Sequence, residues 1–305
     1  MRVPFVYHED YVTPLPHDHR FPMPKFKLLF ELLLKDGLAQ KERIFRPQIA
    51  SYQLLEAAHE SRYIYDFCEG TISENAVRKI GLPWSPQLVR RTCTAVGGTY
   101  LTAKLALRHG LACNLAGGTH HAFPGFGAGF CIFNDLAVAA RALLNEGAEH
   151  KIMIVDLDVH QGDGTAFMFR DEPRVFTFSM HCERNFPFLK QKSDLDIGLP
   201  ESTSDQLYLK ILAEHLPSLL DQFRPDLVFY DAGVDVHKND KLGKFMLTTD
   251  GIIKRERFVL STCLQKGIAV AGVIGGGYTR DRAELAYLHS LLFRAATDLS
   301  GRFLV

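Results

Sequence analysis

The chain has 305 residues, and its 35 Lys and Arg residues balance 35 Asp and Glu residues, so the formal net charge is zero. Hydrophobic residues make up 47% and charged residues 23% of the sequence, which is typical of a globular protein. The balanced charge lacks the bulk basic field that favours nucleic-acid binding, so no nucleic-acid partner is expected. No run of about 18 apolar residues occurs, so no membrane span is expected.

The six cysteines form no C-x-x-C pair, and several lie in apolar stretches. We expect free thiols in a reducing compartment, with neither a disulfide framework nor a zinc–thiolate site. The first residues, "MRVPFVYHEDY", lack the apolar core of a signal peptide. These features predict a cytoplasmic protein. The balanced charge and the lack of a heptad seam favour a monomer.

Composition is even along the chain, with no repeat, low-complexity segment or linker, which predicts a single domain over residues 1–305. Residues 1–25 are rich in Pro and His and are predicted to be irregular. An apolar helical pattern covers 26–36. A second helix is predicted within 51–70, where Ser51 stands at a position suited to a helix cap.

From residue 86 onward, short apolar strands alternate with helices. The strands are predicted at 111–118, 151–160, 174–181, 226–235 and 268–278. The helices are predicted at about 87–109, 134–146, 204–222, 250–266 and 282–298. This alternation predicts an α/β fold with a parallel sheet covered by helices on both faces. In such sheets the ligand site lies beyond the carboxyl ends of the strands.

Polar side chains and glycines follow the apolar part of each of these strands. They are Gly117, Gly118, His120 and His121, then Asp156, Asp158, His160 and Asp163, then His181, then Asp231 and Asp235, and finally three glycines and Tyr278. Because parallel strands end at the same edge of a sheet, these groups should form one His/Asp cluster. Carboxylates are costly to bury unless they are paired or bind a metal, so the cluster needs a partner.

Asp156, Asp158 and His160 are spaced two residues apart, so an extended strand places them on one face. Two of them could ligate a metal while the third orients a neighbour, and Asp235 from another strand would complete the set. Two carboxylates and one imidazole leave a position open for water, which suits catalytic Zn²⁺ or another divalent metal such as Fe²⁺. The alternative is a strand end whose acids cap a helix or face solvent.

His120 and His121 are adjacent and therefore point in different directions, so they are poor candidates for joint ligands of one metal. We expect them to transfer protons, with Asp156 and Asp163 as the carboxylates that set their tautomers. The alternative is a histidine pair that only satisfies hydrogen bonds in a glycine-rich turn.

Two glycine-rich segments resemble nucleotide-binding loops but depart from them. "GFGAGF" at 125–130 has Phe130 where G-x-G-x-x-G requires its last glycine, so we reject a dinucleotide fold. Its glycines would let the backbone approach a narrow ligand between Phe126 and Phe130. "GGGY" at 275–278 is either a tight strand-to-helix turn or a segment that presents the Tyr278 hydroxyl to an oxyanion.

Four motifs in order, "GGTHHAFPGFGAGFCIFND", "VDLDVHQGDGT", "DAGVD" and "GGGY", resemble the zinc-dependent histone deacetylase family over residues 5–295. "NDKLGKFMLTTDGIIKRE" and "GGGYTRDRAELA" are most similar to the class IV branch and its bacterial relatives. The resemblance implies the arginase/deacetylase fold, a parallel β-sheet sandwiched by helices. It also implies a metal-dependent amidohydrolase that removes acetyl groups from Nε-acetyl-lysine in proteins.

The resemblance implies two cation sites. Asp158, His160 and Asp235 match the ligands of a single Zn²⁺ per chain, and Fe²⁺ accepts similar ligands. The family also binds a structural K⁺ close by, and the matching residues are Asp156, Asp158, His160, Ser179 and Met180.

The same resemblance implies the catalytic roles. His121 matches the proton-shuttling histidine and Asp163 its carboxylate partner. His120 matches the second histidine, oriented by Asp156, and Tyr278 matches the tyrosine that stabilises the oxyanion. The metal would polarise the acyl oxygen and its bound water, and His121 would move the proton from this water to the leaving amine.

For the substrate, the resemblance assigns the Gly129 carbonyl to the acyl-lysine amide and Phe130 to one wall of a tunnel. Phe186 or Phe188 would form the opposite wall. Leu242 stands where the polyamine-preferring branch has a gatekeeper glutamate. This difference argues against a polyamine substrate and favours acyl-lysine.

Several alternatives stay open. The loop 68–86 has no obvious counterpart of the rim aspartate, and Glu69 and Glu74 are candidates for that role. An arginase-like ureohydrolase would need a second metal and D-x-H-x-D, but His160 is followed by Gln and Gly. An inactive acyl-lysine-binding module would normally lack one of the site residues, and none is missing. Among hydrolases, a long-chain fatty-acyl-lysine deacylase and a deacetylase of small acylated amines compete with the acetyl-lysine assignment.

Overall fold

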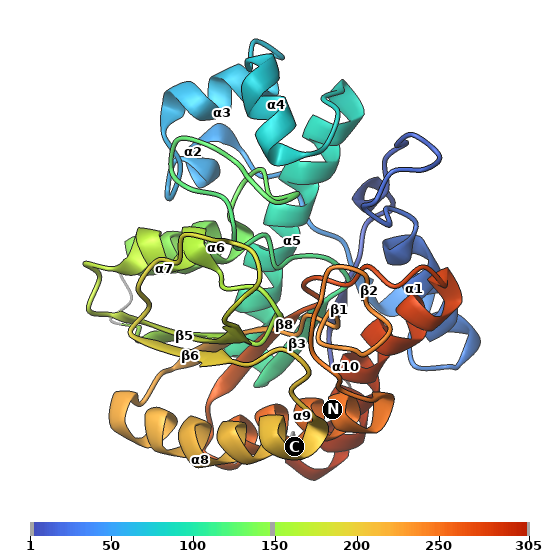
Figure 1. Cartoon of the computed structure of the whole chain (residues 1–305), viewed down its shortest axis with the longest axis vertical. Helices are drawn as coiled ribbons and strands as arrows, with labels where there is room; N and C mark the ends of the chain where they lie inside the picture. Colours follow the sequence, from blue (N-terminus) through green and yellow to red (C-terminus); the bar gives the residue numbers. More distant parts are fainter. Residues whose placement is uncertain (1–2, 147–149, 304–305) are drawn as a thin grey trace.

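Figure 1 shows the computed structural model, which describes residues 3–146 and 150–303. The strands are β1 (Phe5–Val6), β2 (Ile44–Phe45), β3 (Leu111–Asn114), β4 (Ile152–Asp156), β5 (Val175–Cys182), β6 (Leu195–Leu199), β7 (Leu227–Asp231) and β8 (Ala269–Val273). They form an eight-stranded sheet in the order β2-β1-β3-β8-β7-β4-β5-β6, and every pair of neighbours is parallel. The predicted parallel sheet is therefore confirmed.

Helices cover both faces of this sheet. They are α1 (Lys25–Lys35), α2 (Tyr52–Leu55), α3 (Ser61–Cys68), α4 (Glu74–Ile80), α5 (Pro86–His109), α6 (Asp135–Asn145), α7 (Asp163–Phe169), α8 (Asp205–Phe223), α9 (Thr249–Gln265) and α10 (Arg282–Phe303), with 3₁₀ turns at Glu9–Tyr11 and Lys41–Arg43. Helices α5, α6 and α7 lie on one side of the sheet and α8, α9 and α10 on the other (Figure 1). No helix of residues 3–146 and 150–303 is long and apolar enough to cross a membrane.

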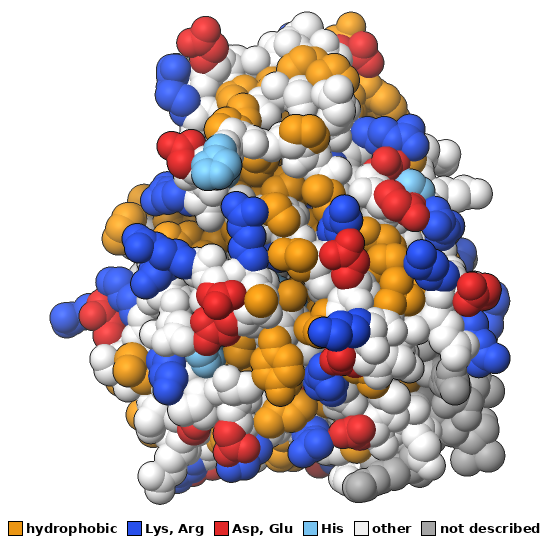
Figure 2. Space-filling model, turned by 90° about the vertical axis from the view of Figure 1, so that its right-hand side faces the viewer, with side chains coloured by type: hydrophobic (Ala, Val, Ile, Leu, Met, Phe, Trp, Pro, Cys, Tyr) orange, Lys and Arg blue, Asp and Glu red, His pale blue; other side chains and the backbone are white. Residues whose placement is uncertain are grey.

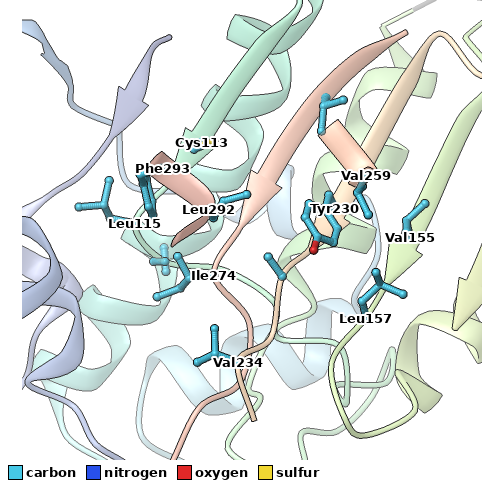
Figure 3. Packing of buried hydrophobic residues seen from close by; sticks show 14 of the residues in the cluster. Cys113, Leu115, Val155, Leu157, Tyr230, Val234, Val259, Ile274, Leu292 and Phe293 are labelled. Atoms are coloured by element: carbon cyan, nitrogen blue, oxygen red, sulfur yellow. The ribbon is translucent and has the colours of Figure 1, made fainter. Parts of the chain in front are cut away.

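The core has two layers because side chains alternate along each strand. On β4, Ile152 and Ile154 belong to the layer under α5 and α6, whereas Val155 belongs to the layer under α8 and α9. Figure 3 shows Val155 and Tyr230 beside Val259 of α9. Since β3, β4, β7 and β8 are buried at every position, their sequences are apolar runs rather than alternating patterns.

The sequence patterns located the long elements but missed the short ones. The helix predicted at 87–109 is α5, and the Ser85 hydroxyl caps it by accepting a hydrogen bond from Leu88 N at 3.0 Å. The helix predicted within 51–70 is two helices, α2 and α3. Residues 1–25 contain β1, a two-residue strand too short to produce a periodic pattern. Strands β2 and β6 and helices α4 and α7 were also missed, and β6 is only partly buried.

Phe229 on β7 is fully buried between the sheet and the α5–α6 layer, whereas Phe188 is 89% exposed. We expect Phe229→Ala to lower the free energy of unfolding by about 3–5 kcal/mol, because it removes an aromatic ring from a close-packed layer. Denaturant unfolding of both variants is the measurement. Phe188→Ala is the control and should change the free energy of unfolding by less than about 0.5 kcal/mol. Similar losses in the two variants would contradict this description of the core.

Candidate active site

The four adjacent strands β3, β8, β7 and β4 end at one edge of the sheet, and the loops after them carry the reactive side chains. These are His120 and His121 after β3, Tyr278 after β8, Asp235 after β7, and Asp158 and His160 after β4. The strands predicted at 111–118, 226–235 and 268–278 were too long. They end at Asn114, Asp231 and Val273, so the polar residues lie in the loops that close the site.

Asp158, His160 and Asp235 form a buried group whose ligand atoms all lie within 4.8 Å of one another. His160 Nδ1 is 3.0 Å from Asp158 Oδ1 and 3.2 Å from Asp235 Oδ2. Asp235 Oδ2 is buried and has no hydrogen-bond partner in the described chain. An orphaned carboxylate oxygen beside a second carboxylate and an imidazole is a donor set that fits Zn²⁺ or Fe²⁺.

Backbone amides orient the two carboxylates. Asp158 accepts hydrogen bonds from Gly276 N at 2.8 Å and His160 N at 2.9 Å. Asp235 Oδ1 accepts one from Val159 N at 2.9 Å, which leaves its Oδ2 free for a cation. A Cβ atom at Gly276 would lie 2.2 Å from Asp235 Oδ2, so this position of the "GGGY" segment has to be glycine. These contacts fix the carboxylates before any ion binds.

Arg255 of α9 fastens the loops that carry both carboxylates. Its fully buried guanidinium donates from Nη1 to the carbonyls of Leu157, at 3.1 Å, and Gly233, at 2.8 Å. Its Nη2 donates to Glu256 at 2.6 Å, so the buried charge is paired. Leu157 immediately precedes Asp158, and Gly233 lies two residues before Asp235. Arg255 therefore sets the spacing between the two carboxylate loops.

The buried Arg255–Glu256 pair was not identified from the sequence, although the residue spacing around it indicates one. Ile252, Arg255, Glu256 and Val259 are spaced i, i+3, i+4 and i+7, which is the spacing of one helix face, and all four are buried. Two adjacent charges of opposite sign on the apolar face of a helix indicate a buried ion pair. Such a pair needs further hydrogen bonds to offset desolvation, and the two loop carbonyls supply them.

Each histidine of the pair after β3 contacts its own carboxylate. His120 Nδ1 is 2.7 Å from Asp156 Oδ2, and His121 Nδ1 is 2.7 Å from Asp163 Oδ1. The two Nε2 atoms are 3.1 Å apart. Burial and the neighbouring His120 lower the pKa of His121 to about 4, so His121 is neutral at pH 7. Donation from Nδ1 to Asp163 then leaves its Nε2 as a proton acceptor.

The environment of His120 has the opposite effect. Burial lowers its pKa, but the charge of Asp156 and the other carboxylates outweighs burial and holds the pKa well above its usual value. The site thus pairs a charged histidine with a neutral one.

Asp231 forms a second buried group with His120 and Asp156, and it is 3.8 Å from His120 Nδ1. Burial and the charge of Asp156 raise the pKa of Asp231 well above the usual carboxyl range. The sequence placed Asp231 at this edge but gave it no role.

Tyr278 lies at the end of the glycine segment, close to the carboxylate group. Its backbone N–H donates to Asp240 Oδ2 at 2.6 Å, which fixes the turn. Burial and the charges of Asp158 and Asp235 raise the pKa of Tyr278 well above 10, so the phenol keeps its proton. Behind it, Lys25 Nζ donates to the Gly275 carbonyl at 3.0 Å. Tyr278 can therefore act as a hydrogen-bond donor next to the carboxylate group.

A model of the histone deacetylase domain matches residues 19–292. This chain belongs to the histone deacetylase family. Histone deacetylase 2 of Arabidopsis thaliana is 30% identical in an alignment of 276 positions that covers 88% of this chain and 71% of that protein. The acetoin utilization protein AcuC of Staphylococcus aureus is 32% identical in an alignment of 304 positions that covers 90% of this chain and 76% of that protein. The resemblance noted from the four motifs is confirmed.

Other comparisons extend over almost the whole chain. An uncharacterized protein of Picosynechococcus is 62% identical over 299 residues, which are 98% of this chain and all of that protein. The crystal structure of a histone deacetylase homolog complexed with SAHA superposes with a TM-score of 0.85 at 26% identity, covering 98% of this chain and 84% of that one. The homolog from Aquifex aeolicus gives 0.84 at 26% identity with the same coverage. The family fold predicted from the motifs is therefore confirmed.

In this member of the histone deacetylase family, aromatic rings lie next to His121 and Tyr278. A Cβ atom at Gly129 would lie 2.8 Å from the ring of His121 and 3.0 Å from that of Phe186, so Gly129 sits between these two rings. Phe186 packs edge-on against His121 with centroids 4.8 Å apart. Phe130 lies 5.8 Å from the Tyr278 ring. Phe188 is 89% exposed, whereas Phe186 lies beside His121.

Other predicted residues fall into two groups. Asp156 of β4 is in register with Ser179 of β5, and Met180 follows Ser179 on this strand, so the residues expected around K⁺ lie together. The two candidates for a rim acid are engaged elsewhere on the surface. Glu69 accepts a hydrogen bond from Tyr52 at 3.0 Å, and Glu74 pairs with Arg78 within α4. Neither contact links these acids to the residues around Tyr278.

We expect Arg255→Lys to weaken divalent-metal binding about tenfold, because lysine keeps the charge but cannot bridge the Leu157 and Gly233 carbonyls at once. Titration of the purified protein with Zn²⁺ against a competing chelator measures this affinity. Arg257→Lys is the matched control, since Arg257 lies two residues away and pairs with Asp298 on the surface. Equal affinity in the two folded variants would refute a positioning role for Arg255.

Proposed function

We propose that this chain is a metal-dependent deacetylase that hydrolyses the acyl amide of Nε-acyl-lysine in proteins or peptides, with acetyl as the preferred acyl group. The observation that carries the proposal is the placement of the Asp158, His160 and Asp235 group beside two His–Asp pairs and a tyrosine. An amide is unreactive, so its hydrolysis needs an activated nucleophile, a proton shuttle and stabilisation of the oxyanion. This arrangement offers candidates for all three.

Asp158, His160 and Asp235 would hold one Zn²⁺ per chain, and Fe²⁺ fits the same oxygen and nitrogen donors. Bound there, the ion supplies Lewis acidity and lowers the pKa of a water molecule toward about 7. Asp156, Asp158, His160, Ser179 and Met180 are proposed to surround a structural K⁺ nearby. The orphaned Oδ2 of Asp235 supports the divalent site.

In the proposed reaction His121 takes a proton from the attacking water through its Nε2, because its Nδ1 already faces Asp163. It then returns this proton to the lysine amine as the amine leaves. Tyr278 donates a hydrogen bond from its phenol to the oxyanion that forms from the acyl oxygen. His120, held by Asp156, adds a positive charge close to the developing negative charge.

The substrate would enter between Phe130 and Phe186, with the aliphatic part of the lysine against both rings and its amide facing the Gly129 carbonyl. Leu242 adds an apolar side chain at the entrance, and its carbonyl accepts a hydrogen bond from Asn185 at 2.9 Å. A leucine in place of a carboxylate at this position favours a neutral acyl-lysine over a polyamine. We further propose a cytoplasmic monomer, a location supported by the six free cysteines.

The assignment is tested with one peptide sequence that carries either acetyl-lysine or myristoyl-lysine, assayed with zinc-loaded protein. We expect turnover of the acetyl peptide to exceed that of the myristoyl peptide. Turnover of the myristoyl peptide alone would replace this assignment by a fatty-acyl-lysine deacylase. Turnover of neither peptide, with activity on small acylated amines, would overturn the protein substrate.

We expect Tyr278→Phe to reduce kcat by about 10²–10³-fold with little change in KM, because it removes one hydrogen-bond donor to the oxyanion. His121→Ala should abolish turnover. Both variants should keep the metal, since neither side chain belongs to the proposed ligand set. Steady-state kinetics and metal analysis of the same preparations check both statements. An active, metal-loaded His121→Ala protein would overturn the role given to His121.

A further inference from the structure

A groove of about 860 Å³ adjoins the candidate active site on the side of residues 12–24. Leu242 and Tyr278, which belong to the proposed site, also line this groove. Its other walls are the 12–24 segment and the start of α10. Figure 2 looks onto this side of the molecule, where hydrophobic side chains run down the middle with charged side chains on both sides. A chain segment next to an acyl-lysine bound in the site would lie over this groove.

The charge along the groove is positive. Its lining includes the exposed cations Arg20, Lys241, Arg280 and Arg282 and a single acid, Asp18. Four positive charges and one negative charge give a local net charge of +3 with neutral histidines, whereas the whole chain has a net charge of zero. A local positive field at the entrance of a site attracts anionic ligands and raises their rate of association.

These cations are also unpaired, unlike many others on the surface. Arg46, Arg90, Arg257, Lys266 and Arg294 each form an ion pair with an acid. Within residues 3–146 and 150–303, no ion pair involves any of the four groove cations. Their charge is therefore left for a ligand from outside.

The acids closest in sequence do not neutralise them. Asp240 turns its carboxylate toward the backbone N–H groups of Leu242, Gly243 and Tyr278. Asp281 accepts hydrogen bonds from the backbone at the start of α10. Both carboxylates are thus used to hold the loops that form the groove, and neither lines it.

We propose that this groove selects acyl-lysine peptides that carry Asp or Glu residues next to the acylated lysine. The inference rests on the proposed deacylase function and names its substrate class. The size of the groove suits several residues rather than a single ion. Lys241, Arg280 and Arg282 are the specificity-determining residues: they contact the flanking carboxylates and leave the reacting amide untouched.

Two acetyl-lysine peptides that differ only in four flanking residues, Glu in one and Gln in the other, test the proposal. At low salt we expect kcat/KM to be about tenfold higher for the Glu peptide, mainly through KM, because several exposed charge pairs add up. The difference should shrink as salt is raised. Equal kcat/KM for the two peptides in the wild type would overturn the proposal.

The triple variant Lys241→Gln, Arg280→Gln and Arg282→Gln should lose the preference for Glu and keep its turnover of the Gln peptide. A matched control, Arg62→Gln, Lys210→Gln and Lys254→Gln, removes three cations from α3, α8 and α9 and should retain the preference. An equal loss of kcat/KM for both peptides in the groove variant would contradict a selective role of these cations.

Binding separates this proposal from the proposed function. Fluorescence anisotropy with a labelled Glu peptide that has an unmodified lysine needs no catalysis. If no acyl peptide is turned over, the proposed function fails. The groove proposal is still supported in that case if the wild type binds the Glu peptide and the groove variant does not. Absence of binding would overturn the groove proposal. Competition by free glutarate as strong as that by the unlabelled peptide would replace the peptide with a small dicarboxylate.

Discussion

Carboxylates gathered at the carboxyl ends of adjacent parallel strands dominate this structure. Asp156, Asp158, Asp231 and Asp235 are almost wholly buried, and each buried carboxyl group must be protonated, paired or bound to a cation. His120 supplies part of the balance: burial lowers its pKa, but the surrounding acids outweigh burial and hold the pKa well above its usual value. The orphaned oxygen of Asp235 indicates that a further cation belongs beside it. The same need for positive charge thus explains both the metal-ligand group and the charged histidine.

The rest of the fold holds this cluster in place. The sheet aligns β3, β8, β7 and β4, so their loops converge, and a glycine at position 276 lets the backbone pass against two carboxylates. On the other side, Arg255 links the loops of Asp158 and Asp235 through two backbone carbonyls. Pre-organised ligands of this kind bind a metal without a large rearrangement. The groove cations, in contrast, are exposed and unpaired, as expected of groups that select a substrate.

The sequence predicted the central strands because they are continuous apolar runs, and it predicted the site because polar residues follow those runs. It could not predict β1 and β2, because each strand has only two residues and is too short to show a periodic pattern. Arg255 was missed because the sequence does not show that its side chain is buried and reaches the carbonyls of two loops far from it in the chain. Phe186 and Phe188 are two residues apart in one loop, and only the folded chain shows that one packs on His121 while the other is exposed.

The most direct test of the account is a titration with Zn²⁺ that records both stoichiometry and the thermal unfolding midpoint, for the wild type and for Asp235→Ala. We predict that the wild type binds one tight ion per chain and unfolds at a higher temperature when loaded, because the ion binds the folded state. Asp235→Ala should fold but lose this stabilisation. Tight binding that survives in Asp235→Ala, or a wild type that neither binds nor is stabilised, would contradict the central role given to the buried carboxylates.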